Sequence, residues 1–189
     1  MNNQERVEYV QQIQDTKDNF YETHKKNWLF KNKQKLECSE TLTRELDLMK
    51  MVQCTIFQVP NTNIIYYNYL VFKTYANEKT KDYVYNHMIT LVHNILQVYP
   101  TFEFHINLKT FSISAAHRYY SLITSTFDEN KIFTKQLTKL KIYHTPSIIS
   151  QLTSLFHNQV KDIIGIVEYC YKDSDQKIAK LFEHVEKSI

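Results

Sequence analysis

Glycine is almost absent from this chain, since Gly165 is the only glycine among 189 residues. Phosphate-binding loops of the P-loop or dinucleotide type need several backbone positions without a Cβ atom. The sequence therefore argues against nucleotide binding through either type of loop. A nucleophilic serine raised between glycines at a sharp turn is missing for the same reason.

Cysteine is also scarce, with Cys38, Cys54 and Cys170 as the three examples. They form no C-x-x-C pair and have no histidines at metal-binding spacing, so we expect small buried side chains in a reduced protein. No run approaches the roughly 18 to 20 apolar residues that a membrane span requires. We expect a soluble, cytoplasmic protein that is not an enzyme and uses no cofactor or metal.

The charge of the chain is nearly balanced, because 23 basic residues face 20 acidic ones and give a net charge of +3. Arginine, the better residue for bidentate contacts to phosphate and guanine, occurs only at Arg6, Arg44 and Arg118. Nucleic acid is therefore an unlikely partner. Lysine in place of arginine, with abundant Asn, Ile and Tyr, is typical of AT-rich genomes, including those of large DNA viruses.

One short segment, residues 24–35, concentrates positive charge around aromatic side chains. Its residues of interest are Lys25, Lys26, Trp28, Phe30, Lys31, Lys33 and Lys35. Such a segment could bind an anionic membrane surface, with Trp28 and Phe30 inserted at the interface. A protein partner and a single-stranded nucleic acid are competing interpretations, and a solvated face whose aromatics pack on the domain remains open.

Hydrophobic periodicity divides the chain into a helical beginning and an alternating remainder. Residues 4–24 carry a thin apolar stripe of helical period, and a second helix is predicted to begin near Ser39 or Thr41. Strands are then predicted at 54–60, 64–75, 101–111, 140–146 and 162–170. Helices are predicted at 81–99, at 112–127, at 147–160 and after 173.

This order predicts an α/β domain over residues 51–189, preceded by a helical segment over 1–50. The first two strands form an antiparallel hairpin, and the whole sheet is mixed but mostly parallel, with flanking helices.

The strand at 101–111 alternates strictly between apolar and polar residues. Glu103, His105, Asn107 and Lys109 fall on the polar side. We expect this row to be exposed at a sheet edge, the alternative being that it rims a cavity. Glu103 and His105 could support a proton relay or half of a metal site, but a structural or surface role is the expectation.

Two stretches resemble the CRAL-TRIO (Sec14-like) lipid-binding family. FHINLKTFSIS at 104–114 is similar to a strand and turn of that family, with Asn107 where aspartate is usual and Thr110 where glycine is usual. LKIYHTPSII at 140–149 is similar to its strand, proline turn and apolar helix. The resemblance covers about residues 54–170.

The resemblance implies a hydrophobic pocket between sheet and helix that holds a lipid, such as a phospholipid or a tocopherol-like or retinoid-like molecule. The expected lining residues are Phe102, Phe104, Ile106, Leu140, Ile142, Ile148, Leu152 and Phe156. This function needs a cavity of roughly 300 Å³ or more. The alternative is a degenerate fold with a filled pocket, serving through its N-terminal helices as an interaction or structural subunit of a larger assembly, such as a viral one.

Overall fold

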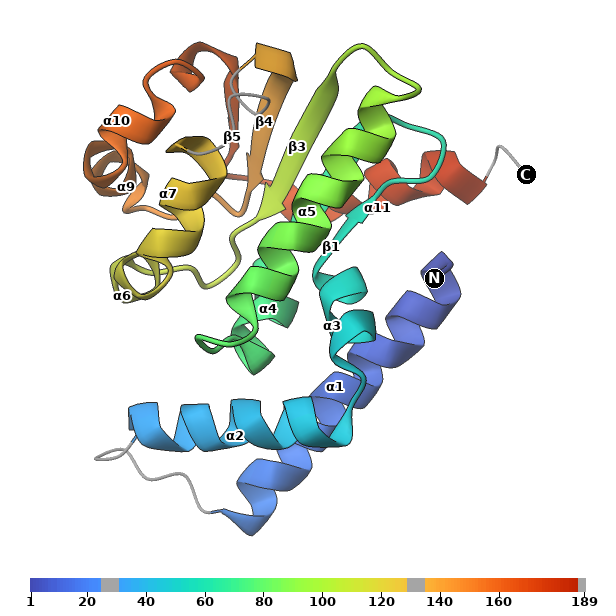
Figure 1. Ribbon diagram of the computed structural model, residues 1–189, viewed down its shortest axis with the longest axis vertical. Coiled ribbons are helices and arrows are strands. Elements are labelled where there is room, and N and C mark those ends of the chain that lie inside the picture. The colour runs from blue at the N-terminus through green and yellow to red at the C-terminus, as the bar shows by residue number, and fades with distance from the viewer. Residues whose placement is uncertain (25–30, 129–134, 187–189) are drawn as a thin grey trace.

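The computed structural model describes residues 1–24, 31–128 and 135–186 (Figure 1). Three helices come first: α1 (Asn3–Thr23), α2 (Lys31–Glu45) and α3 (Leu48–Thr55). The rest alternates between strands and helices, in the order β1 (Ile56–Gln58), β2 (Ile64–Asn68), α4 (Tyr69–Tyr75), α5 (Lys81–Leu96), β3 (Phe102–Asn107), α6 (Ile113–Arg118), α7 (Tyr120–Asp128), β4 (Leu137–Tyr143), α9 (Ile149–Leu155), α10 (His157–Val160), a 3-10 turn η1 (Ile164–Ile166), β5 (Val167–Cys170) and α11 (Ser174–Glu186).

The five strands form one sheet in the order β1-β2-β3-β4-β5. β1 and β2 pair antiparallel, with Phe57 opposite Tyr66, and all the other pairs are parallel. The predicted α/β class, the antiparallel hairpin and the mostly parallel sheet are therefore confirmed.

The spatial order of the strands decides where the helices lie. Each parallel strand lies beside the one before it in the chain, and such crossovers are nearly always right-handed, so the connecting helices collect on one face. In Figure 1, α5, α7 and α9 lie on this face and α11 crosses behind the sheet. The face behind carries a small separate cluster around Phe57, Tyr66 and Tyr143, against which Phe182 of α11 packs.

The N-terminal helices share the main core. Ile13 and Phe20 of α1 and Leu42 of α2 belong to the same buried cluster as the sheet residues. α3 and α4 provide the link, since α1 packs on α3 and α2 packs on α4. The expected boundary between residues 50 and 51 falls inside α3.

Helix α2 begins at Lys31, so the predicted start near Ser39 or Thr41 is wrong. Lys, Gln, Leu and Glu are strong helix formers, and they continue the helix through residues 31–37. Ser39 lies inside the helix and is buried. Its hydroxyl does not cap a helix end, because it donates to the Tyr75 carbonyl at 2.8 Å.

The predicted strand at 64–75 is only half correct. β2 ends at Asn68, whose side-chain oxygen accepts a hydrogen bond from the Leu70 amide at 3.1 Å and begins α4. Tyr69, Phe72 and Tyr75 then lie on the buried side of this short helix. Aromatic composition thus reflected burial here, not strand structure. The predicted strand at 54–60 is likewise shortened, because residues 54 and 55 end α3.

Four other predicted elements differ from the structure. β4 covers residues 137–143 instead of 140–146. The predicted helix at 147–160 is interrupted at Phe156, whose backbone (φ −106°, ψ 21°) separates α9 from α10. The helix predicted at 112–127 is interrupted in the same way at Tyr119, between α6 and α7. Residues 164–166 form the 3-10 turn, which shortens the last strand to 167–170.

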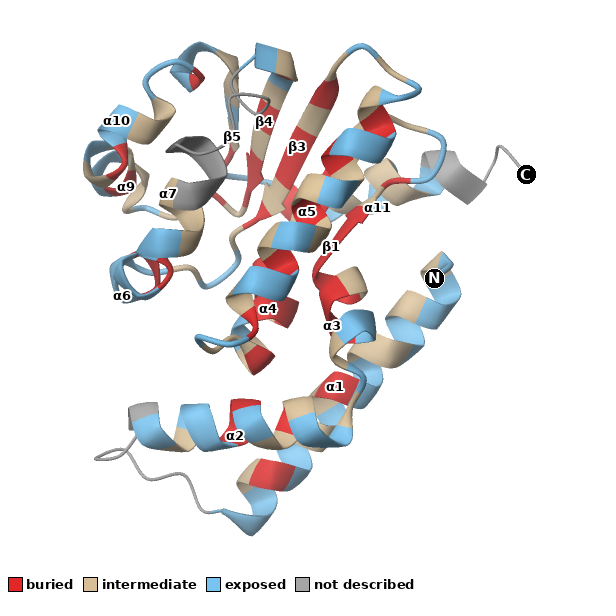
Figure 2. Ribbon diagram, in the orientation of Figure 1, coloured by how far each residue is buried: buried red, intermediate tan, exposed pale blue. Residues whose placement is uncertain are grey.

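The polar row of β3 is not exposed at an edge, and that expectation is wrong. β3 is the central strand, and His105 and Asn107 are 5% and 6% exposed. Figure 2 shows that β3 is buried along much of its length. The row faces the side of the sheet that α11 crosses. His105 bonds there to Glu103 of the same strand and to the Tyr143 hydroxyl of β4.

Candidate functional site

An apolar cavity of about 190 Å³ lies between the sheet and the helices that cover one face of it, the face on which α5, α7 and α9 lie. The sheet contributes side chains of one parity from neighbouring strands, Phe104 and Ile106 of β3 and Leu140 and Ile142 of β4. Parallel register places these residues side by side, since Phe104 is opposite Leu140 and Ile106 is opposite Ile142. The opposite wall comes from α4, α5, α7, α9 and α10.

Six of the eight residues expected to line a pocket line this cavity, namely Phe104, Ile106, Leu140, Ile142, Leu152 and Phe156. Phe102 is fully buried in the main core and does not line the cavity. Ile148 packs against the cluster of Ala116, Leu152 and Phe156 without lining the cavity.

Other lining residues were missed by sequence reasoning, and these are chiefly Tyr67, Tyr69, Phe72, Tyr119, Leu122 and Val160. Tyr67 could have been found, because it has the same parity as the buried Ile65 on β2 and pairs with Ile106. Tyr69 and Phe72 could not, because residues 69–75 were predicted as a strand and not as α4.

The lining carries no charged side chain among the described residues. Burial raises the pKa of Tyr67 and raises that of Tyr69 to about 12, so both phenols stay neutral at ordinary pH. The Thr153 hydroxyl donates to the Ile149 carbonyl at 2.9 Å and so is already satisfied. The cavity therefore favours an apolar occupant.

The size of the cavity limits that occupant. A volume of about 190 Å³ is below the roughly 300 Å³ expected for a lipid pocket. It exceeds the engineered cavity of about 150 Å³ that holds benzene in another protein. A single ring or a short acyl group fits this space, whereas a whole phospholipid does not.

On the other face of the sheet, a chain of hydrogen bonds accounts for both ring nitrogens of His105. Nε2 lies 3.0 Å from Glu103 Oε2, and Nδ1 lies 3.0 Å from the Tyr143 hydroxyl. Because an ionised carboxylate can only accept, Nε2 carries the proton, and Nδ1 of the neutral ring accepts from Tyr143. Burial lowers the pKa of His105, with Glu103 acting in the opposite direction.

Glu103 and His105 do not form a metal site with a third residue, because the described parts of the chain contain no cluster of three metal-binding side chains. His144 bonds instead to Asp175 at 2.9 Å. Burial raises the pKa of the Cys54 thiol to about 11, which keeps it protonated and unreactive near neutral pH.

The lysine-rich segment is only partly described. Lys25, Lys26, Trp28 and Phe30 lie outside the described residues, and Lys31 begins α2 but its side chain is not described. Lys33 is exposed and forms an ion pair with Glu37 at 3.8 Å. Lys35 turns toward the body of the protein and lines a second, larger hollow.

Within the described ranges, no helix combines the length and apolar character needed to cross a membrane. The resemblance to the CRAL-TRIO family stays a prediction, because comparison with known protein families, curated proteins and solved structures finds no match to this chain.

Proposed function

We propose that this protein binds a compact hydrophobic ligand, without chemical turnover, in the cavity between its sheet and α7, α9 and α10. The observation that carries the proposal is an apolar cavity of about 190 Å³ whose described lining residues include no charged side chain. Transfer of apolar surface from water into such a space provides the driving force, at roughly 25 cal/mol per Å² of buried surface.

A relationship to the CRAL-TRIO family is part of the proposal. The apolar helix after Pro146 supplies Leu152 and Phe156 to the cavity, as the resemblance implies. Thr110, which occupies the position where glycine is usual in that family, has a φ of +69°, and this region of φ favours glycine. A ligand with a longer tail would have to displace α9 or α10.

Toluene is a suitable first test ligand, because it matches the cavity in size and carries no charge. Titration followed by methyl NMR should give saturable shifts for Leu140, Ile142 and Leu152, and little change for the exposed Val7 and Val98. The absence of saturable shifts at the cavity methyls would contradict the proposal.

A cavity-filling variant sharpens the test. Val160→Phe places a larger side chain into the cavity from α10, so toluene affinity should fall at least tenfold, or about 1.4 kcal/mol. Asn158→Phe adds the same ring at an exposed position of the same helix and should bind toluene as the wild type does. Equal binding by all three proteins would place toluene elsewhere.

Extraction of the protein purified from its native source, followed by mass spectrometry of the organic phase, identifies the natural ligand. We expect a stoichiometric compound with a small apolar group. The other function class, an interaction subunit that uses α1 and α2, predicts a filled cavity that rejects toluene, and it remains a prediction.

A further inference from the structure

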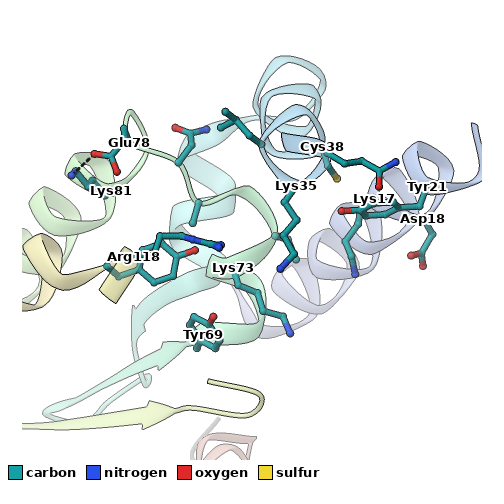
Figure 3. Close-up of a pocket in the computed structure, with 16 residues that line it drawn as sticks. Lys17, Asp18, Tyr21, Lys35, Cys38, Tyr69, Lys73, Glu78, Lys81 and Arg118 are labelled. Atoms are coloured by element: carbon teal, nitrogen blue, oxygen red, sulfur yellow. Dashed lines mark hydrogen bonds and ion pairs between the residues drawn. The ribbon is translucent and has the colours of Figure 1, made fainter. Parts of the chain in front are cut away.

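A second hollow, of about 830 Å³, opens between the N-terminal helices and the α/β domain (Figure 3). Its walls come from α1, α2, α4, the loop before α5, and α6. We call it the basic cleft, because its charged lining residues are Lys17, Lys35, Lys73, Lys81, Arg118, Asp18 and Glu78. Among the described residues, five cationic groups thus face two carboxylates, whereas the whole chain is nearly balanced.

Three of the lysines crowd one another. Figure 3 shows Lys17, Lys35 and Lys73 extending from α1, α2 and α4 into the same space, with Arg118 on the side opposite Lys17. Partial burial lowers the pKa of Lys73, and the charges of Lys17 and Lys35 lower it further. Like charges gathered in a hollow repel one another, and a bound anion would relieve that repulsion.

Both carboxylates of the cleft already have hydrogen-bonding partners. Glu78 forms an ion pair with Lys81 at 2.5 Å, and Asp18 accepts from Gln14 at 2.7 Å. Lys17 and Lys73 donate to neutral oxygens, those of Gln14 at 3.1 Å and Thr110 at 2.7 Å.

We propose that the basic cleft binds a ligand carrying two or more phosphate groups. Lysine ammonium groups are compact charges that suit phosphate, and the planar guanidinium of Arg118 suits a bidentate contact to a second phosphate. The Tyr69 and Tyr119 rings also line the cleft, close to Arg118, and their hydroxyl groups are potential donors.

The dimensions of the cleft favour a small molecule. Its volume falls in the range of roughly 300 to 1,000 Å³ that is usual for small-ligand sites. An extended nucleic acid would need a basic stripe along the surface, and the chain has a net charge of only +3. The phosphate groups can belong to a free compound or to a lipid headgroup, since the same chemistry recognises both.

Sodium tripolyphosphate is the ligand for the first experiment, by isothermal titration calorimetry at physiological salt. We expect saturable binding at one site per chain and a rise in melting temperature. Lys35→Gln and Lys73→Gln should each weaken binding about tenfold, because a charge-assisted hydrogen bond is lost. Lys33→Gln is the matched control, since Lys33 lies on the same helix but pairs with Glu37 in solvent.

Vesicles separate the two sources of phosphate. The protein should sediment with vesicles that contain a phosphatidylinositol bisphosphate and not with vesicles of phosphatidylcholine alone, if the ligand is a lipid headgroup. Tripolyphosphate should then compete with the vesicles, and Lys35→Gln should abolish the sedimentation. Tripolyphosphate binding without vesicle binding would identify a free compound. Both results support the proposal.

Three results would overturn it: no saturable heat with tripolyphosphate, an equal loss in Lys33→Gln, or tighter binding of a single-stranded oligonucleotide that depends on Lys35 and Lys73. Val160 lines the apolar cavity and not the basic cleft, so saturable tripolyphosphate binding by Val160→Phe would test this proposal separately from the apolar cavity.

Discussion

Thr110 holds a backbone conformation that a β-branched residue rarely adopts. Its φ of +69° lies in the left-handed region, where a Cβ atom costs roughly 1 to 2 kcal/mol. The Thr110 hydroxyl accepts a hydrogen bond from Lys73 Nζ, so the residue joins the turn after β3 to the basic cleft.

Thr110→Gly should therefore be more stable than Thr110→Ala. Both variants lose the hydroxyl, but only glycine removes the strain, and the larger backbone entropy of unfolded glycine offsets part of the gain. We expect the free energy of unfolding from urea titrations to be about 1 kcal/mol higher for the glycine variant. Equal stabilities would show that this turn stores no strain.

His105 should make the stability of the protein depend on pH near neutrality. Unfolded histidine binds a proton below about pH 6.5, whereas burial lowers the pKa of folded His105. The unfolded state therefore holds more protons in this window, and the free energy of unfolding rises with pH. The stabilisation is complete above about pH 6.5 and is lost as the pH falls toward the folded pKa.

Urea titrations at several pH values between about 5 and 8 measure this dependence. His105→Gln should have a shallower slope than the wild type. Burial lowers the pKa of His87 as well, so His87→Gln should reduce the slope separately, and the two reductions should add. A wild-type slope in His105→Gln would mean that His105 does not gain its proton on unfolding.

At the scale of elements, the strict alternation within residues 101–111 predicted a strand and the side of each of its residues, although β3 covers only Phe102–Asn107. It could not predict burial of the polar side, because that depends on α11, which lies about 70 residues later in the chain. Likewise, nothing local separates strand from helix in residues 64–75, where aromatic and β-branched residues dominate both halves. The structure changes from strand to helix at Asn68, whose side chain accepts a hydrogen bond from the Leu70 amide.

Asn68→Ala should destabilise the start of α4. It removes the acceptor for the Leu70 amide, and loss of such a side-chain cap costs about 1 kcal/mol. Asn68→Asp keeps an acceptor and adds a negative charge near the helix start, so it should retain most of the stability. Urea unfolding of both variants measures the difference. A loss in Asn68→Asp as large as in Asn68→Ala would exclude a capping role.

The candidate sites differ in how far sequence could predict them. The residues that the sheet contributes to the apolar cavity could be predicted from the alternation of apolar and polar residues along each strand. Every second residue of a strand points to the same face, and neighbouring parallel strands place these residues side by side. Lys17, Lys35, Lys73 and Arg118 of the basic cleft come from four separate helices, with no spacing that relates them. Only the packing of the N-terminal helices brings these cations together.

At the scale of the whole molecule, the N-terminal helices and the sheet should unfold as one unit, since a single buried cluster includes both. Ile13 of α1 is 1% exposed, so Ile13→Ala should lower the free energy of unfolding by about 2 to 5 kcal/mol. Val7→Ala is the matched control, because Val7 is 64% exposed on the same helix, and it should cost less than about 0.5 kcal/mol.

Circular dichroism and tyrosine fluorescence should record the same urea midpoint for Ile13→Ala. Two separated transitions, with only the first shifted by the mutation, would mean that α1 and α2 unfold independently of the sheet.

Tyr69 and Tyr119 line both the apolar cavity and the basic cleft, and their ring centroids are 6.3 Å apart. These two rings therefore separate the apolar cavity from the basic cleft. A ligand that shifts either ring when it binds in the cavity changes the shape of the cleft, and a ligand in the cleft can change the shape of the cavity in the same way. Thermodynamic reciprocity then requires that each ligand alter the affinity of the protein for the other ligand by the same factor. The two rings would thus couple binding at the cavity to binding at the cleft.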